Sequence, residues 1–156
     1  MTINREYFTV ELASQIVLGL SLTEMATVVQ FETKYICAVP GVAEFWHGVV
    51  NFKGSLLWVL DSDRFLGLSD KNKTSPQKLT AIIIQDRQKQ IALATRQLKG
   101  IVAVEPSELK SLANDSTSQL HQCCSAIAQT AAGVFYTLDS AALLQQLHQQ
   151  SGLVSV

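Results

Sequence analysis

The sequence has no block of concentrated charge. Its 156 residues contain 12 Lys and Arg against 13 Asp and Glu, which gives a formal net charge of −1. The basic residues are scattered, whereas nucleic-acid tails and polybasic membrane anchors need positive charge gathered in one place. The composition therefore argues against both of these classes and is typical of an ordinary globular protein.

Long hydrophobic runs are also absent, although 47% of the residues are hydrophobic. The longest apolar stretches, such as Leu56–Leu60 and Ala81–Ile84, span only a few residues, whereas a bilayer-crossing helix needs about 20. Met1–Tyr7 has no apolar core, which does not fit a signal peptide. We therefore expect a cytoplasmic protein with no direct membrane insertion.

Cysteine is scarce and odd in number: Cys37, Cys123 and Cys124. The two adjacent cysteines can pair only through a strained eight-membered ring, so reduced thiols are the simpler interpretation. A chain of 156 residues can bury roughly 68–70% of its unfolded surface, so it needs no disulfide or metal to fold.

The motifs of common catalytic and cofactor sites are missing. The sequence contains no G-x-S-x-G elbow and no phosphate-binding loop of the G-x-x-x-x-G-K-[ST] or G-x-G-x-x-G kind. No two histidines have helical ligand spacing, and the His121-x-Cys123-Cys124 cluster lacks a second ligand pair at zinc-finger spacing. We expect no catalytic residues, no metal and no cofactor.

Two weaker patterns have structural explanations. Asp61-x-Asp63 has the spacing of a metal-binding or general-acid pair, but aspartates at a helix start also favour the positive end of its dipole. We interpret the pair as helix capping. Aromatic and basic residues are interleaved around Phe52 and Lys53, yet strand alternation puts these two on opposite faces. We therefore expect neither an enzyme nor a nucleic-acid partner.

Period-two hydrophobic patterns dominate the first two thirds of the chain and predict many short strands joined by short turns. The expected strands are Tyr7–Ala13, Ile16–Leu20, Ala26–Phe31, Gly48–Lys53, Ser55–Leu60, Leu79–Gln85, Ile91–Thr95, Ile101–Val104, Cys123–Thr130 and Val134–Leu138. So many short strands indicate small antiparallel barrels or a sandwich.

Helices are expected to be few and short. Asp139 is positioned to cap the one long helix, Ser140–Gln150, whose leucines share a face. The polar stretch Ser69–Lys78 is the expected linker, and the rest of the chain reads as one domain over residues 1–156. Short helical turns are expected at Ser21–Glu24, which has the spacing of a capping box, and at Val42–His47, Asp61–Leu66 and Ser107–Leu112; Ala113–Gln119 is expected to be a loop.

The segment Pro40–Leu68 reads PGVAEFWHGVVNFKGSLLWVLDSDRFLGL and resembles the signature region of the CheW-like domain family. The family pattern is L-P-G-x-P-x-F-x-x-G-[VI]-[IV]-N-[LIF]-R-G-x-[LIV]-x-P-V-x-D-L-x-x-x-L-G. Matches fall in register without gaps at Pro40, Gly41, Phe45, Gly48, Val49, Asn51, Gly54, Val59, Asp61, Leu66 and Gly67. The hairpin Phe8–Leu20, Leu22-x-Glu24-Met25 and Leu138-Asp139 match further family positions in the same order.

This resemblance implies a mainly β fold of two SH3-like, five-stranded antiparallel β-barrels packed together, with short helices and a C-terminal helix. It also implies a non-catalytic signalling adaptor. Such an adaptor couples a methyl-accepting chemoreceptor or photoreceptor to a CheA-like histidine kinase at membrane-associated receptor clusters. A barrel of the kinase's regulatory domain would pack against a barrel of the adaptor. The groove between the adaptor's own two barrels would bind the helical tip of the receptor.

Departures from the pattern indicate a divergent branch of the family. Lys53 replaces the usual arginine and loses its planar five-donor fork. Trp58 replaces a proline, Ser62 replaces a leucine, and Thr95–Gln97 stand where an acidic residue is usual. These changes favour the adaptors of type IV pilus-based chemotaxis or phototaxis.

Eight positions are expected to report on partner binding: Leu22, Glu24, Trp46, Asn51, Phe52, Lys53, Gly54 and Trp58. Each also has a structural explanation: Glu24 as the partner of Ser21 in a capping box, Phe52 and the tryptophans as core, Lys53 as a solvated charge and Gly54 as a backbone requirement. Two other functions stay open, namely an adaptor for a response regulator and a small-ligand sensor. The sensor would need a convergent set of buried polar groups, which the sequence does not reveal.

Overall fold

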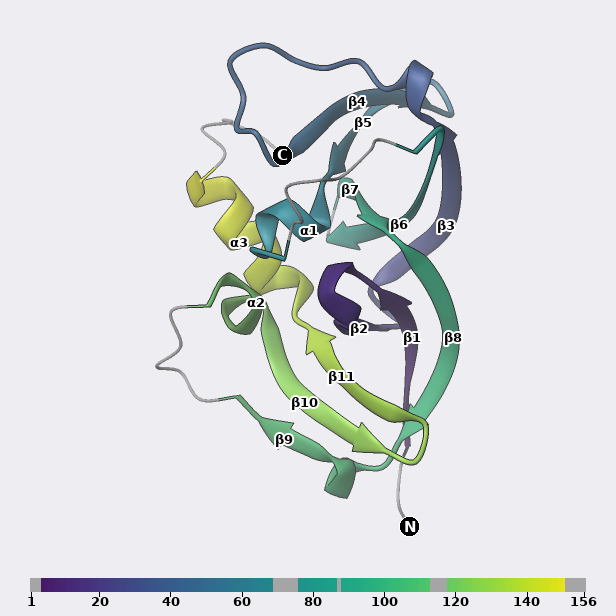
Figure 1. Ribbon diagram of the computed structural model, residues 1–156, viewed down its shortest axis with the longest axis vertical. Helices are drawn as coiled ribbons and strands as arrows, with labels where there is room; N and C mark the ends of the chain where they lie inside the picture. The colour runs from purple at the N-terminus through teal and green to yellow at the C-terminus, as the bar shows by residue number, and fades with distance from the viewer. Residues whose placement is uncertain (1–3, 69–75, 87, 113–117, 151–156) are drawn as a thin grey trace.

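The computed structural model describes residues 4–68, 76–86, 88–112 and 118–150, which form two curled β-sheets with helices beside them (Figure 1). The strands are β1 (Arg5–Glu11), β2 (Val17–Ser21), β3 (Met25–Glu32), β4 (Trp46–Phe52), β5 (Ser55–Leu60), β6 (Lys78–Asp86), β7 (Lys89–Thr95), β8 (Gln97–Val104), β9 (Leu109–Ser111), β10 (Cys124–Thr130) and β11 (Gly133–Leu138). The α-helices are α1 (Ser62–Phe65), α2 (Gln119–Gln122) and α3 (Ser140–Gln150), and short 3₁₀ turns lie at Ala13–Gln15, Thr33–Tyr35 and Pro106–Glu108.

The first sheet joins the two ends of the chain. Its strand order is β8-β1-β2-β11-β10-β9, and β2 pairs in parallel with β11. Tyr7, Val104, Ala128 and Phe135 fill its concave interior, where the rings of Tyr7 and Phe135 meet edge to face at 5.7 Å. The N-terminal hairpin is therefore stabilised by strands that lie more than a hundred residues later in the sequence.

The second sheet is built from the middle of the chain. Its order is β3-β6-β7-β5-β4, and β5 pairs in parallel with β7. The β-branched run of β6 alternates between two environments: Ile83 points into the interior of this sheet, while Ile82 and Ile84 face the first sheet. A strand buried on both faces explains why β6 reads as an unbroken apolar run.

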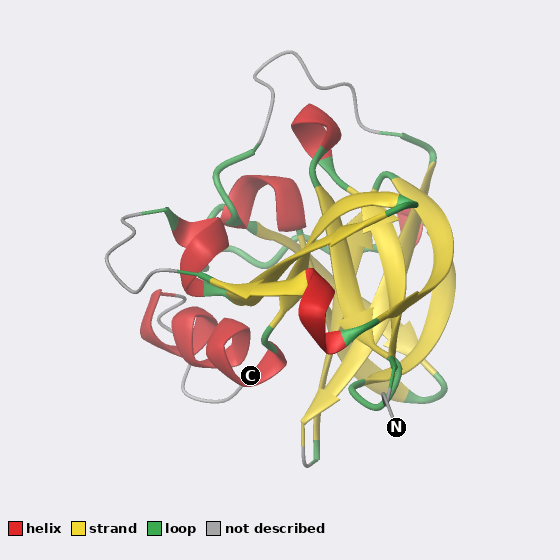
Figure 2. Cartoon of the chain, turned by 90° about the horizontal axis from the view of Figure 1, so that it is seen from below, coloured by secondary structure: helices red, strands yellow, loops and turns green. Residues whose placement is uncertain are grey.

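The two sheets share one hydrophobic core. Val10, Leu18 and Leu20 of the first sheet pack in the same buried cluster as Ile82 and Ile84 of the second. The helices α1, α2 and α3 gather on one side of the sheets (Figure 1, Figure 2). Leu143 and Leu147 of α3 are fully buried in this cluster, so the helix completes the core.

The backbone at Gly48 explains why a glycine stands at this position of the signature segment. Its φ is +138°, and a Cβ at this position would lie 2.1 Å from the carbonyl oxygen of Cys37. Cys37 and Val49 exchange backbone hydrogen bonds of 2.8 and 2.9 Å across this contact. Only glycine lets the segment at Cys37 approach β4 so closely.

The predicted mainly β fold of two SH3-like barrels with short helices and a C-terminal helix is confirmed. The ten expected strands all exist, with ends shifted by a few residues. The first sheet carries a sixth strand, β9, because Leu109–Ser111 pairs with Ala126–Ala128 instead of continuing a helical turn. The helical turn expected at Ser107–Leu112 is shorter than predicted and begins one residue earlier, at Pro106–Glu108.

Three local predictions were wrong. Ser21–Glu24 is not helical, because Glu24 N–H donates to the Ser21 carbonyl at 2.9 Å in a turn between β2 and β3. Val42–His47 forms no helix, since Trp46 and His47 already belong to β4. Gln119 lies in α2 and not in a loop.

Two expected connections fall largely outside the described residues, namely 69–75 of the expected linker and 113–117 of the expected loop. The elements that flank 69–75 are α1, which follows β5, and β6. Because β5 and β6 belong to the same sheet, the linker does not join the two sheets. The chain passes from one sheet to the other after β2 and again after β7.

Among the helices of the described residues, none has the length and apolar composition needed to span a bilayer.

Candidate functional site

The signature segment forms the β4–β5 hairpin, and its tip is a two-residue loop. Lys53 and Gly54 have φ values of +52° and +85°, the left-handed pair that a type I′ turn requires. The Asn51 side-chain oxygen accepts a hydrogen bond of 3.0 Å from the Gly54 N–H. Asn51 and Gly54 therefore hold the turn, and Lys53 is exposed at its tip.

Phe52 lies between the core and the surface. Its ring is half-buried and meets the buried ring of Phe31 edge to face at 6.3 Å. The Lys53 ammonium lies 5.2 Å from the centre of the Phe52 ring, within the range of a cation–π contact. The core and partner-binding interpretations of Phe52 are thus both compatible with its position.

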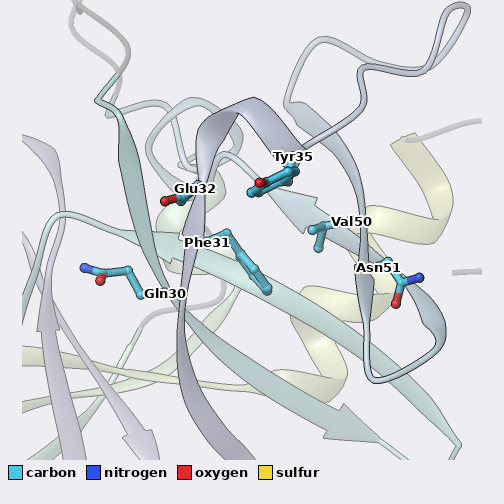
Figure 3. A pocket seen from close by; sticks show the side chains of 6 residues that line it. All are labelled: Gln30, Phe31, Glu32, Tyr35, Val50 and Asn51. Atoms are coloured by element: carbon cyan, nitrogen blue, oxygen red, sulfur yellow. The ribbon is translucent and has the colours of Figure 1, made fainter.

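A groove of about 440 Å³ opens beside this hairpin (Figure 3). Phe31 and Val50 are the buried residues among those that line it, and Gln30, Glu32, Tyr35 and Asn51 complete the lining. The Tyr35 ring is 62% exposed. An apolar base with a polar, aromatic rim is typical of a protein-binding surface.

The hairpin also carries an exposed leucine, on the same face as the Asn51 side chain. Leu56 pairs with Asn51 across the two strands and is 75% exposed. We define the hairpin surface as the groove residues together with Phe52, Lys53, Gly54 and Leu56. Leu56 was missed by the sequence reasoning because it reads as part of a buried apolar strand.

The two tryptophans lie in the shared core. Their rings are 5.2 Å apart, and Trp46 is only 6% exposed while Trp58 is half-buried. Phe45 joins them, with its ring 5.7 Å from Trp46 and 4.8 Å from Phe65. Trp58 therefore replaces the family's proline with a packing partner for Trp46.

Leu22 and Glu24 lie away from the hairpin surface, in the turn that precedes β3. Phe31 lies near the far end of that strand, roughly 20 Å away at about 3.3 Å per residue. Glu24 forms no capping box; its carboxylate accepts a hydrogen bond of 2.9 Å from the Ser140 hydroxyl at the start of α3. The predicted residues thus fall into three separate places.

Leu22 borders a second exposed apolar area, on β1 and β8. The Leu22 N–H donates to the Glu6 carbonyl of β1 at 3.4 Å, and β1 pairs Phe8 with Ile101 and Val10 with Leu98. Ile101 is 58% exposed and Leu98 38%. We define the β8 face as Leu22, Phe8, Leu98 and Ile101. Leu98 and Ile101 are apolar, so the sequence pattern of β8 did not indicate that their side chains are exposed.

The buried cysteines are poor nucleophiles. Burial, together with the negative charge of Asp139, raises the pKa of Cys123 from 9.0 to about 12. Burial, the neighbouring Cys123 and Asp139 raise the pKa of Cys124 to about 12 as well. Thiols that stay protonated at neutral pH are weak nucleophiles. Among the described residues, no cluster of three or more His, Cys, Asp or Glu could hold a metal ion.

Comparison with known proteins agrees with this geometry. A family model described as CheW-like domain matches residues 6–148. Among solved structures, the scaffolding protein TtCheW from Thermoanaerobacter tengcongensis superposes with a TM-score of 0.75 at 17% sequence identity, covering 88% of this chain and 90% of that one. At this identity the likeness shows the fold alone. No curated protein matches the chain.

Proposed function

The chain belongs to the CheW-like domain family, and we propose that it is a non-catalytic adaptor that couples a chemoreceptor or photoreceptor to a CheA-like histidine kinase. The observation that carries this proposal is the family match over residues 6–148, together with two separate exposed apolar areas on one small molecule. An adaptor needs two surfaces that can be occupied at once. The protein would act in the cytoplasm, at receptor clusters on the membrane.

We assign the hairpin surface to the kinase. The regulatory domain of such a kinase has the same barrel fold, so it would meet this surface as one barrel edge against another. Tyr35 and Leu56 offer exposed apolar area, and Lys53 offers a cation beside Phe52. Aromatic and apolar residues at the centre of a contact commonly supply most of its binding energy.

We assign the β8 face to the receptor. Leu98 and Ile101 project beside Phe8, so they form a short apolar row that continues the shared core toward solvent. A helix presents apolar residues at i, i+3, i+4 and i+7 and can lay such a stripe on this face. Leu22 extends the row.

The departures from the family pattern support a pathway of pilus-based motility or phototaxis. Lys53 keeps the positive charge of the usual arginine but makes no bidentate contact with a carboxylate. This change also favours the second candidate, in which the hairpin surface docks a response regulator and not the kinase.

The test is a pull-down with the tagged full chain from native lysate, with captured proteins identified by mass spectrometry. Recovery of a histidine kinase together with a methyl-accepting receptor supports the proposal. Recovery of a response regulator without the kinase supports the second candidate, and recovery of none of these proteins overturns both. Lys53→Glu is expected to remove the hairpin partner, whereas Lys110→Glu on β9 of the other sheet serves as the matched charge reversal.

A further inference from the structure

A second pocket, of about 470 Å³, lies at one end of the first sheet. It forms where β1 and β10 begin and where β2 and β11 end, and Glu24 and Asp139 complete its rim. It shares no residue with the hairpin surface or the β8 face. Two segments within residues 5–24 and two within residues 125–139 thus bring polar side chains to one place.

The pocket contains one cation and two carboxylates. Among the described residues, Arg5 makes no ion pair. One oxygen of Glu24 accepts from Ser140, and one oxygen of Asp139 accepts from the Ala142 N–H at 3.1 Å. Each carboxylate therefore keeps an oxygen for a further donor, and the Arg5 guanidinium keeps its full set of donors.

Tyr7 supplies a second, independent sign of a ligand. It lines the pocket and is 6% exposed, yet within the described part of the chain its hydroxyl has no hydrogen-bond partner. The Tyr7 ring is buried, but its hydroxyl is not a buried atom; it opens to the pocket, where it can donate to a bound molecule. The neighbouring hydroxyl of Thr137 is satisfied by Ser125 at 2.8 Å, so the phenol of Tyr7 is the group left for a bound molecule.

We propose that this pocket binds a free α-amino acid, and a basic one in preference. Arg5 would hold the ligand carboxylate through two parallel hydrogen bonds, and Tyr7 would donate a third. Glu24 and Asp139 would accept from the ammonium groups. The two carboxylates and the one guanidinium give the pocket a net negative charge. A ligand with two cationic groups and one carboxylate, such as arginine or lysine, neutralises this charge and offers a partner to each of the three groups. The pocket volume lies in the range of small-molecule sites, which hold about 300–1,000 Å³.

The experiment is calorimetric titration of the full chain with L-arginine, with putrescine and L-leucine as comparison ligands. We expect L-arginine to bind best, because putrescine lacks the carboxylate and L-leucine lacks the second cation. Arg5→Gln and Tyr7→Phe should each weaken L-arginine binding about tenfold or more, since each removes a hydrogen bond to a charged group. Glu6→Gln is the matched control, because strand alternation turns Glu6 to the other face of β1.

Tyr7→Phe keeps the ring contact with Phe135, so a loss of binding in that variant reports on the hydroxyl and not on folding. Absence of a binding signal with both L-arginine and L-lysine overturns the inference, as does equal affinity in Arg5→Gln, Tyr7→Phe and the unaltered protein. Capture of kinase and receptor is measured separately. A chain that captures both but binds no amino acid overturns this inference and leaves the adaptor function intact.

Discussion

The Asp63 carboxylate of α1 accepts a hydrogen bond from the Arg96 guanidinium of the β7–β8 connection at 3.1 Å. Its other oxygen accepts from the Ala13 N–H at 2.7 Å. Asp63 is 4% exposed. Ala13 lies in the turn between β1 and β2 of the first sheet, and Arg96 lies where the chain passes from β7 of the second sheet to β8 of the first. A single carboxylate therefore ties together the places where the two barrels meet.

Asp63→Ala should lower the free energy of unfolding by about 1–3 kcal/mol, because it leaves the Ala13 N–H and a charged guanidinium without an acceptor. Denaturant titration followed by tryptophan fluorescence measures the change. Arg64→Gln is the control, since Arg64 and Glu44 form an exposed pair 3.7 Å apart and exposed pairs contribute about 0–1 kcal/mol. Equal stability of the two variants would contradict a structural role for Asp63.

Leu143→Ala should destabilise the protein by about 2–5 kcal/mol, the usual cost of a cavity at a fully buried leucine. Leu143 is 1% exposed and lies in the core shared by both sheets. Leu144, its neighbour on α3, is half-buried and should cost less when changed to alanine. An unshifted unfolding midpoint for Leu143→Ala would mean that α3 does not pack on the core in solution.

Leu56→Asp and Ile101→Asp should separate the two partners. Both side chains are more than half exposed, so neither change is expected to alter the unfolding midpoint by much. Leu56→Asp places a charge on the hairpin surface and should abolish kinase capture, while Ile101→Asp should abolish receptor capture. Surface-immobilised protein and each purified partner give the two affinities. If one variant lost both partners, the assignment of separate surfaces would be wrong.

The strands were predictable from the sequence because their signal is local. A run of apolar, β-branched residues marks β6, and Asp139 caps α3 as its position predicts. The pairing of β2 with β11 has no local signal, since nothing near Leu18 specifies Tyr136 as its neighbour. The two points at which the chain crosses from one sheet to the other, after β2 and after β7, could not be predicted for the same reason.

The same limit applies to single side chains. Asp61 and Asp63 look alike at a helix start, yet only Asp61 caps α1, through the Arg64 N–H at 3.1 Å. Asp63 instead bonds to Ala13 and Arg96, both distant in sequence. Glu24 has capping-box spacing from Ser21, but its partner is Ser140. The polar pocket around Tyr7 could not be predicted, because four separate segments build it.

The thiols should show two classes of reactivity. Cys37 is exposed, whereas Cys123 and Cys124 are buried with pKa values raised to about 12. At pH 8 a thiol-disulfide reagent should modify one cysteine quickly in the folded protein and all three in denaturant. Fast reaction of two or three thiols in the folded protein would contradict the burial.

The raised pKa values of Cys123 and Cys124 also make the stability of the protein depend on pH in the alkaline range. Because the unfolded thiols ionise near their ordinary pKa of 9.0 and the folded ones near 12, the unfolded state loses protons first as the pH rises. The contribution of these thiols to stability is thus complete below about pH 9 and falls between pH 9 and 12. Cys123→Ala/Cys124→Ala should therefore lose less stability than the unaltered protein between pH 8 and 10.5 in denaturant titrations, although its stability at pH 8 is lower. Parallel losses in both proteins would place the alkaline sensitivity in other groups.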